Sequence, residues 1–379
     1  MKTILTFACI ILRLASQAFS LRSAVTALLL APLAGMAVDE TATEIVPSST
    51  PVGVRHPDDR TDWFMQARYG VMMHFGVGPH NVALVDKFDV ARLAEQLQEA
   101  GAGYFMLMLG QNSGCYAAPN AAYDEITSSS PGARCSIRDL PLELHRALHP
   151  KGIKLMLYMP ANPPDVPEIR RQFGWDSQDE AGRPTPKRDR GKPTQHSLEK
   201  WCKVIREWSM RYGEKVAGWW IDGAYKQLYD KPETPDQPGI ALLSAAIKAG
   251  NPAAIVAFNG GLRNRPFFYA DHDDYIAGHD VGANQLSEIP ESRFIGSTQW
   301  HALVYMGSNW GGSQRRFSTE QWLGYCQNVF AKGGVITFDV GKNTDPKSGN
   351  PVGTIADEHF QQLKAIKAGL QHVSPATKK

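Results

Sequence analysis

From residue 70 onward, short runs of apolar residues alternate with longer segments in which apolar residues recur every three to four positions. Short apolar runs are typical of strands that are buried on both faces, whereas the longer spacing is typical of helices that pack by one face. Their alternation predicts βα units and a parallel sheet. The predicted strands are 70–75, 104–109, 154–159, 216–221, 254–258, 274–277, 298–305 and 334–340, and the main predicted helices are 89–100, 140–148, 197–212, 240–249, 319–331 and 356–370.

Eight strands that are mostly separated by helices favour a closed (β/α)8 barrel of the TIM type, irregular in its second half. A doubly wound open sheet is the alternative, but no glycine-rich phosphate loop follows any predicted strand. We expect one barrel domain over residues 60–375, with an extended linker over 38–59 before it. The proline-rich and charged stretch 160–195 predicts a long surface loop over the barrel mouth.

The first 37 residues have the pattern of a secretory signal peptide. Apolar runs cover residues 4–12 and 24–36, so that cleavage after Ser20 or after Ala37 fits the pattern. Because Arg13 interrupts the first run, we favour the second. Neither run reaches the roughly 20 apolar residues of a membrane span. We therefore expect an exported protein, secreted or periplasmic, without a membrane span.

Charge and cysteine content narrow the range of partners. Removing residues 1–37 takes away three basic residues and no acidic one, so that 40 Lys and Arg fall to 37 against 38 Asp and Glu. A near-neutral chain does not predict nucleic acid or an anionic membrane as a partner. Cys115 and Cys135 bracket one loop and form the candidate disulfide, whereas Cys202 and Cys326 lie in helical patterns and are expected to be buried free thiols.

The strongest chemical signal is the sequence WWIDG. The apolar run 216–221 ends in two tryptophans and an isoleucine, Asp222 follows, and Gly223 ends the strand. Active sites of barrel enzymes lie at the carboxyl ends of the strands, where a carboxylate beside aromatic rings can attack a sugar. Asp222 is therefore the predicted nucleophile, and capping of the next turn is the structural alternative.

Further polar and aromatic residues lie at the ends of other predicted strands. Amide, imidazole and phenol groups can bind sugar hydroxyls, and aromatic rings can stack on the apolar face of a sugar. The predicted substrate-binding residues are His74, Gln111, Asn112, Tyr158, Trp220, Asn259, His279 and Trp300. Burial in the core is the structural alternative for the histidines and tryptophans.

One acidic cluster, residues 271–274 with His279 and Asp280, contains groups that could ligate zinc or manganese. It lacks two histidines at a helical spacing, and a solvated loop explains it equally well. We therefore predict no metal and no cofactor.

Four segments, in this order and spacing, resemble the catalytic barrel of the α-L-fucosidases, family 29 of the glycoside hydrolases. They are WFMQARYGVMMHFG at 63–76, FDVARLAEQLQEAGAGYFMLM at 88–108, GWWIDG at 218–223 and GGVITFDVG at 333–341. The resemblance covers most of residues 60–372. It implies a retaining mechanism with Asp222 as the nucleophile, His74 as a histidine that contacts the sugar, and Tyr158 as a tyrosine near the sugar ring.

The chain departs from the family pattern at several places. After the second strand the family usually has His-His-Asp-Gly, where this chain has Gln-Asn-Ser-Gly at 111–114. After the fifth strand the family often has Asn-Asp-Arg, where this chain has Asn-Gly-Gly at 259–261. Near the sixth strand a family glutamate often serves as the acid, where this chain offers His279 and Asp280. The family often has a β-sandwich after the barrel, and we expect none here. The resemblance therefore predicts the fold better than the sugar.

A retaining glycosidase needs a second carboxyl roughly 5 Å from the nucleophile, which acts first as an acid and then as a base. Glu288 and Asp280 are equal candidates, Glu291 ranks behind them, and His279 is a further donor. The sequence thus predicts an exported retaining glycoside hydrolase that acts on an α-L-fucoside or a related glycoside through a glycosyl-enzyme intermediate. A carbohydrate-binding barrel without activity is the alternative, and a metal-dependent hydrolase comes third. The sequence leaves the oligomeric state open.

Overall fold

The computed structural model describes residues 60–79, 82–175, 195–225, 239–261, 268–269, 271–280, 282 and 286–371. The expected signal peptide and linker lie outside these residues, as do residues 176–194 of the expected surface loop and the last four residues of the expected barrel domain. Within the described part of the chain, no helix is both long and apolar enough to cross a bilayer.

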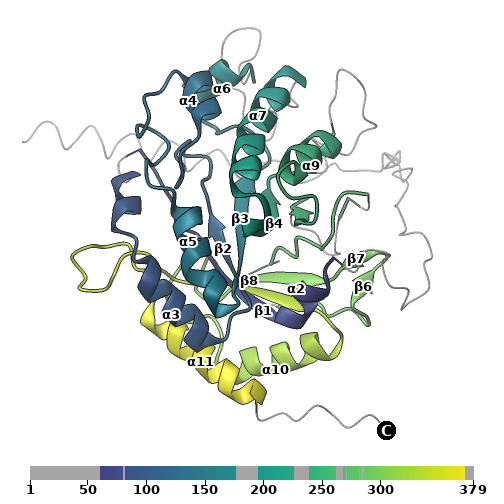
Figure 1. The fold of residues 1–379 in the computed structure, drawn as a ribbon. Helices are drawn as coiled ribbons and strands as arrows, with labels where there is room; N and C mark the ends of the chain where they lie inside the picture. Colours follow the sequence, from purple (N-terminus) through teal and green to yellow (C-terminus); the bar gives the residue numbers. More distant parts are fainter. Residues whose placement is uncertain are drawn as a thin grey trace, which may run out of the picture. The chain divides into compact units, whose positions relative to one another are not determined.

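A curved sheet of seven parallel strands forms the centre of the fold (Figure 1). The strand order is β5-β4-β3-β2-β1-β9-β8, so that β1 to β5 follow one another in chain order. Such an order is that of a TIM-type barrel, and it confirms the predicted fold class. The strands are β1 (Tyr69–Met73), β2 (Tyr104–Met108), β3 (Lys154–Pro160), β4 (Val216–Asp222), β5 (Ile255–Phe258), β8 (His301–Tyr305) and β9 (Val335–Asp339). A short antiparallel pair, β6 (Phe294–Ile295) and β7 (Thr298–Gln299), lies outside the main sheet.

The predicted sixth strand, 274–277, is not a regular strand, and this part of the prediction is wrong. Segment 274–280 lies between β5 and β8. On one side Asp274 N donates to Val256 O over 2.9 Å. On the other side the segment forms two isolated bridges, Tyr275 with Gln299 and His279 with Leu303, rather than a continuous ladder. Two carboxylates of this region replace the rest of the ladder, because Val256 N donates to Asp274 and Phe258 N donates to Asp273. The seven strands therefore form a curled half-barrel that this irregular segment extends.

Helices cover the outer face of the sheet (Figure 1). The six predicted helices are confirmed as α3 (Val90–Ala100), α5 (Leu140–Leu148), α7 (Gln195–Tyr212), α9 (Ile240–Lys248), α10 (Thr319–Ala331) and α11 (Asp357–Gln371). The pattern did not predict α2 (Asp62–Ala67), α4 (Ala121–Thr127) or the 3-10 helices η1 (Val82–Lys87), η2 (His149–Lys151) and η4 (Gly213–Lys215). The expected surface loop is wrong at α6 (Pro167–Phe173), which begins with a proline, whose fixed φ suits the first helical turn, and buries Ile169 and Phe173.

Side chains alternate between two cores along the strands. Trp219 and its outward-facing neighbours pack beneath the helices, whereas Trp220 and the inward-facing side chains fill the space that the sheet encloses. Helix α2 places Phe64 at the N-terminal end of this space, with its ring 5.0 Å from the ring of Tyr104 and 5.4 Å from that of His301. Phe64 therefore helps to fill the N-terminal end of the enclosed space, and the opposite end is the one where the strands finish.

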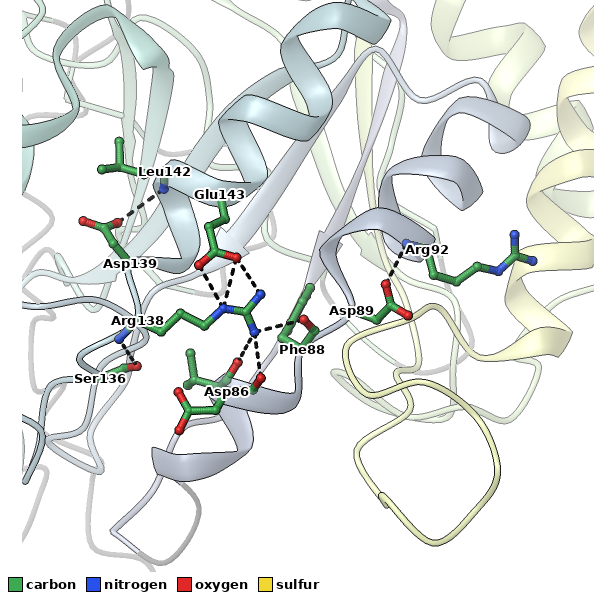
Figure 2. Close-up of polar contacts among 10 residues, drawn as sticks. Asp86, Phe88, Asp89, Arg92, Ser136, Arg138, Asp139, Leu142 and Glu143 are labelled. Carbon is green, nitrogen blue, oxygen red and sulfur yellow. Dashed lines mark hydrogen bonds and ion pairs between the residues drawn. The ribbon is translucent and has the colours of Figure 1, made fainter.

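Arg138 holds the loop that follows β1 (Figure 2). Its guanidinium donates to the carbonyl oxygens of residues 85, 86 and 88 over 2.7, 3.1 and 3.0 Å, and it pairs with Glu143 of α5 over 2.6 Å. Asp89 and Asp139 cap α3 and α5 by accepting hydrogen bonds from backbone N–H groups of the first turn (Figure 2). The loop that begins at His74 is thereby fixed to the helices outside it.

All four cysteines among the described residues are buried free thiols. The candidate disulfide between Cys115 and Cys135 is therefore not formed. Main-chain hydrogen bonds join the two segments instead, because Tyr116 N donates to Arg134 O and Ser136 N donates to Tyr116 O, each over 2.9 Å. The prediction that Cys202 and Cys326 are buried free thiols is confirmed.

Candidate active site

The carboxylate of Asp222 lies at the end of β4, where three side chains donate hydrogen bonds to it. Tyr158 Oη and Gln111 Nε2 donate to Oδ2 over 2.5 and 3.0 Å, and Asn259 Nδ2 donates to Oδ1 over 2.8 Å. These donors come from β3 and from the segments that follow β2 and β5. Hydrogen bonds to an ionised carboxylate are strong and directional, so the three donors fix its orientation. Four predicted site residues therefore meet at one point.

Aromatic rings surround this carboxylate. The ring of Trp220 is nearly parallel to that of Tyr158, at 5.0 Å and 14°, and to that of His279, at 6.3 Å and 24°. Trp220 is only 1% exposed, and its Nε1 donates to Ala277 O over 2.9 Å. Trp220 therefore positions Tyr158 and His279. We call the rings of Tyr158, Trp220, His279 and Trp310 the aromatic wall, and Trp310 is its partly exposed tryptophan.

Trp310 extends the wall to the other side of the mouth. Its ring lies 4.8 Å from that of His279, 5.6 Å from that of His74 and 4.9 Å from that of Tyr305. A partly exposed ring at this place can stack on the apolar face of a sugar. Trp310 lies in a loop after β8 rather than on a strand.

His74 is held by an aspartate that the sequence analysis did not single out. His74 Nδ1 lies 2.7 Å from Asp339 Oδ1, and the side chain of Asp339 at the end of β9 is 0% exposed. Asp339 Oδ2 accepts a hydrogen bond from Gly311 N over 2.6 Å. The signal that could have found Asp339 is the run VITFDVG, which, like WWIDG, ends an apolar strand in an aspartate near a glycine.

His279 is a second histidine of the mouth. Its Nδ1 lies 3.1 Å from the carbonyl oxygen of Asp280. Burial lowers the pKa of His279 below its ordinary value of 6.5, and the negative charge of Asp222 opposes that effect. His279 is therefore a titratable group that senses the charge of Asp222.

The carboxylates predicted as acids differ in their surroundings. Asp280 forms an ion pair with Arg316 in which the two side chains are 0% and 3% exposed. Glu288 is exposed. Glu291 is also exposed, since its side chain is 90% accessible and pairs with Lys332 over 2.5 Å. The three side chains that donate hydrogen bonds to Asp222 are Tyr158, Gln111 and Asn259.

Two predicted substrate-binding residues also lie apart from the cluster. Asn112 is exposed at the loop beyond Gln111, where its backbone N–H donates to the Gln111 side chain over 3.1 Å. Trp300 is 2% exposed and packs in the outer core against Gly334, where an added Cβ would lie 2.0 Å from the ring. Trp300 is therefore beneath the helices rather than in the mouth.

In the acidic segment 271–274, the carboxylates of Asp273 and Asp274 accept hydrogen bonds from backbone N–H groups. Asp273 accepts from Phe258 N and Tyr269 N over 2.7 and 2.6 Å, and Asp274 pairs with Lys248 over 2.8 Å. Among the described residues, no three His, Cys, Asp or Glu side chains gather in a way that could hold a metal ion.

Comparison with known families gives one match by sequence. Residues 79–372 match the sequence model of the α-L-fucosidase family. No curated protein sequence matched the chain.

Solved structures give matches by fold. The endo-fucoidan hydrolase MfFcnA4 of glycoside hydrolase family 107 superposes with a TM-score of 0.64 at 17% identity, over 83% of this chain and 54% of that one. The chain thus spans about half the length of that relative. The α-L-fucosidase isoenzyme 1 from Paenibacillus thiaminolyticus superposes with a TM-score of 0.55 at 17% identity, over 83% and 76% of the two chains. A family 29 α-L-fucosidase from Bacteroides thetaiotaomicron, trapped as a covalent intermediate, gives 0.55 at 16%, over 85% and 78%.

Proposed function

We propose that this chain, which belongs to the α-L-fucosidase family of glycoside hydrolases, hydrolyses an α-L-fucoside with retention of configuration. The observation that carries the proposal is the Asp222 carboxylate, fixed at a strand end by three hydrogen-bond donors. A nucleophile of this kind must be oriented before the substrate arrives, because effective attack requires the reacting atoms to be aligned. The trapped covalent intermediate of the Bacteroides thetaiotaomicron relative supports a covalent route.

The hydrogen bonds distinguish the two oxygens of Asp222. Oδ2 accepts from both Tyr158 and Gln111, whereas Oδ1 accepts from Asn259 alone. Oδ1 therefore keeps the freer lone pair, and we assign it the attack on the anomeric carbon. In this step the Oδ1–carbon bond forms as the glycosidic bond breaks, and the leaving oxygen must receive a proton.

We assign the transfer of that proton to His279. The carboxylate of Asp280 is paired with Arg316, and the side chain of Glu288 is exposed. His279, in contrast, stacks on Trp220 and interacts with the charge of Asp222. Protonated His279 donates to the leaving oxygen in the first step. Neutral His279 then takes a proton from the water that attacks the glycosyl-enzyme, and Asp222 is released.

The sugar and the place of action are also proposals. Family membership supports an α-L-fucoside, and the similar fold of an endo-fucoidan hydrolase supports a fucose-containing chain as the physiological substrate. The signal pattern in the first 37 residues supports export of the enzyme.

Azide rescue of two variants tests the assigned roles. Asp222→Gly should abolish turnover of an aryl α-L-fucoside, and azide should restore it with an inverted fucosyl azide as the product. His279→Ala should keep most activity toward a fucoside with a highly acidic phenol as the leaving group, lose it toward poor leaving groups, and give a retained fucosyl azide. Glu288→Gln is the matched control and should behave as the wild type. Turnover by Asp222→Gly without azide, or an acid-type defect in Glu288→Gln, would refute the assignment.

The pH dependence gives an independent check on His279. An acid must be protonated, so kcat/KM should fall as the pH rises through the pKa of His279, which burial sets below 6.5. The falling limb should disappear in His279→Ala when the leaving group needs no proton. A falling limb that persists unchanged in this variant would assign the proton to another group.

A further inference from the structure

Asp339 accepts hydrogen bonds at both of its oxygens. Oδ1 lies 2.7 Å from His74 Nδ1, and Oδ2 accepts from Gly311 N over 2.6 Å. The side chain of Asp339 is 0% exposed, whereas that of His74 is 20% exposed. The carboxylate is thus hidden behind the imidazole, and only the histidine of this pair reaches the mouth.

The chemistry of the two groups fixes the position of the proton. An ionised carboxylate can only accept, so the nitrogen that faces it must carry the hydrogen. In a neutral imidazole with its proton on Nδ1, the other nitrogen, Nε2, is an acceptor. Asp339 therefore selects one of the two tautomers of His74.

The ring of His74 lies within the site that contains the predicted nucleophile. It is 5.6 Å from the ring of Tyr158, which donates to Asp222, and 5.6 Å from the ring of Trp310. Other charged or titratable groups also act here. His279 interacts with His74, and Lys342 interacts with Asp339 and donates to Gly311 O over 3.4 Å. Tyr158 and His359 interact with the charge of Asp339 as well.

We propose that Asp339 is a positioning residue that holds His74 with the proton on Nδ1, so that Nε2 accepts a hydrogen bond from a hydroxyl of the substrate. The tautomer stands on the contact between the two residues, and the identity of the bound hydroxyl rests on the proposed function. The carboxylate of Asp339 also accepts a hydrogen bond from Gly311 N, next to Trp310 in the chain. Asp339 therefore fixes the position of the His74 imidazole and of the backbone that carries Trp310.

The arrangement makes the site selective for a free hydroxyl. A nitrogen that only accepts cannot bind a fluorine, an ester oxygen or a sulfate oxygen, because each of these lacks a hydrogen to donate. Leaving a buried acceptor without its partner lowers binding, and we expect a loss of about 5- to 100-fold in kcat/KM for a substrate blocked at this one position. Blocking a hydroxyl that His74 does not contact should not show this dependence on Asp339.

The variant Asp339→Asn inverts the tautomer while keeping the size of the side chain. An asparagine amide can donate to Nδ1, which moves the imidazole proton to Nε2 and turns this nitrogen into a donor. The 15N NMR signals of His74, assigned by comparison with His74→Gln, report the tautomer without any substrate. We expect the Nδ1-protonated form in the wild type and the Nε2-protonated form in Asp339→Asn.

Kinetics with 3-fluoro and 4-fluoro derivatives of an aryl α-L-fucoside then test what the tautomer does. With the wild type, kcat/KM should be about 10-fold or more lower for one of the two fluoro substrates than for the substrate with the free hydroxyl. In Asp339→Asn, the ratio of these two kcat/KM values should move toward one, mainly because the KM values become similar. Asp139→Asn, which weakens the cap of α5, is the control for general destabilisation and should keep the wild-type ratio. An Nε2-protonated His74 in the wild type, or an unchanged ratio in folded Asp339→Asn, would overturn the proposal. A wild type that cleaves no fucoside would refute the proposed function, and NMR would still decide the tautomer.

Discussion

Replacing Asp280 by alanine should destabilise the protein without the kinetic signature of a lost acid. The side chains of Asp280 and Arg316 are 0% and 3% exposed, so removing the carboxylate breaks a buried ion pair from one side. Breaking a buried ion pair from one side costs about 3–5 kcal/mol. Arg316 also donates to Tyr305 O over 3.2 Å and lies 4.0 Å from the ring centroid of Tyr305, which favours the lower end of that range. At about 2–4 °C per kcal/mol for a large domain, the melting temperature should fall by roughly 10 °C.

Calorimetry and a leaving-group series separate the two effects. Asp280→Ala should melt earlier, yet its kcat/KM at a temperature where it is folded should keep the wild-type dependence on the acidity of the leaving group. The double variant Asp280→Leu with Arg316→Met should recover part of the lost stability, since apolar residues of similar volume often replace a buried pair without loss. An unchanged melting temperature together with a steep new dependence on the leaving group would show that Asp280, rather than His279, is the acid.

Three further predictions concern the nucleophile, the thiols and a core histidine. Burial and the nearby charge of Asp222 raise the pKa of Tyr158, so its hydroxyl stays protonated and donates to Asp222. Tyr158→Phe should therefore lower kcat/KM for a fucoside about 10- to 100-fold. An unchanged kcat/KM would show that this hydrogen bond does not serve the nucleophile. Because Cys115 and Cys135 are free thiols, dithiothreitol should leave the melting temperature unchanged, and a melting temperature that depends on the reductant would contradict this. Because burial raises the pKa of both thiols, iodoacetamide should label neither cysteine in the native protein. Burial lowers the pKa of His301 from 6.5 to about 4. As the pH falls, His301 is protonated in the unfolded chain before it is protonated in the folded protein. The contribution of His301 to the free energy of unfolding is therefore complete above pH 6.5 and decreases by about 3 kcal/mol toward pH 4. Urea unfolding of the wild type and of His301→Gln at pH 7 and 4.5 measures the difference, which would be absent if His301 were already charged in the fold.

The strands of the first half of the sheet were predictable because buried parallel strands appear as continuous apolar runs. The predicted ranges 104–109 and 216–221 match β2 and β4 to within one residue at each end. Segment 274–280 failed because its hydrogen bonds are made by carboxylate side chains as well as backbone, and a hydropathy pattern cannot distinguish such a segment from a strand. Residue 167 shows the converse error, since proline suggested a loop where it begins a helix.

The candidate site was predictable to the extent that strand ends determine it. Asp222, Gln111, Tyr158 and Asn259 follow from their places at the ends of predicted strands, and the structure brings them within hydrogen-bond distance. Partners that depend on side-chain direction were not predictable. Asp280 follows the same segment as His279, yet its carboxylate reaches Arg316, which lies 36 residues later in the chain. Asp339 repeats the pattern of Asp222 and could have been found by applying the same reasoning to the last strand.

Among the described residues, four rings fill the N-terminal end of the space that the sheet encloses. Phe64, Tyr104, Tyr275 and His301 are each 0% exposed, so these side chains close that end. In the proposed mechanism, the sugar, the departing alcohol and the incoming water would then all bind at the C-terminal ends of the strands. Water would reach the glycosyl-enzyme after the first alcohol has left. A second alcohol bound in that place would accept the sugar instead of water, so the proposed mechanism predicts transfer to an added alcohol in competition with hydrolysis.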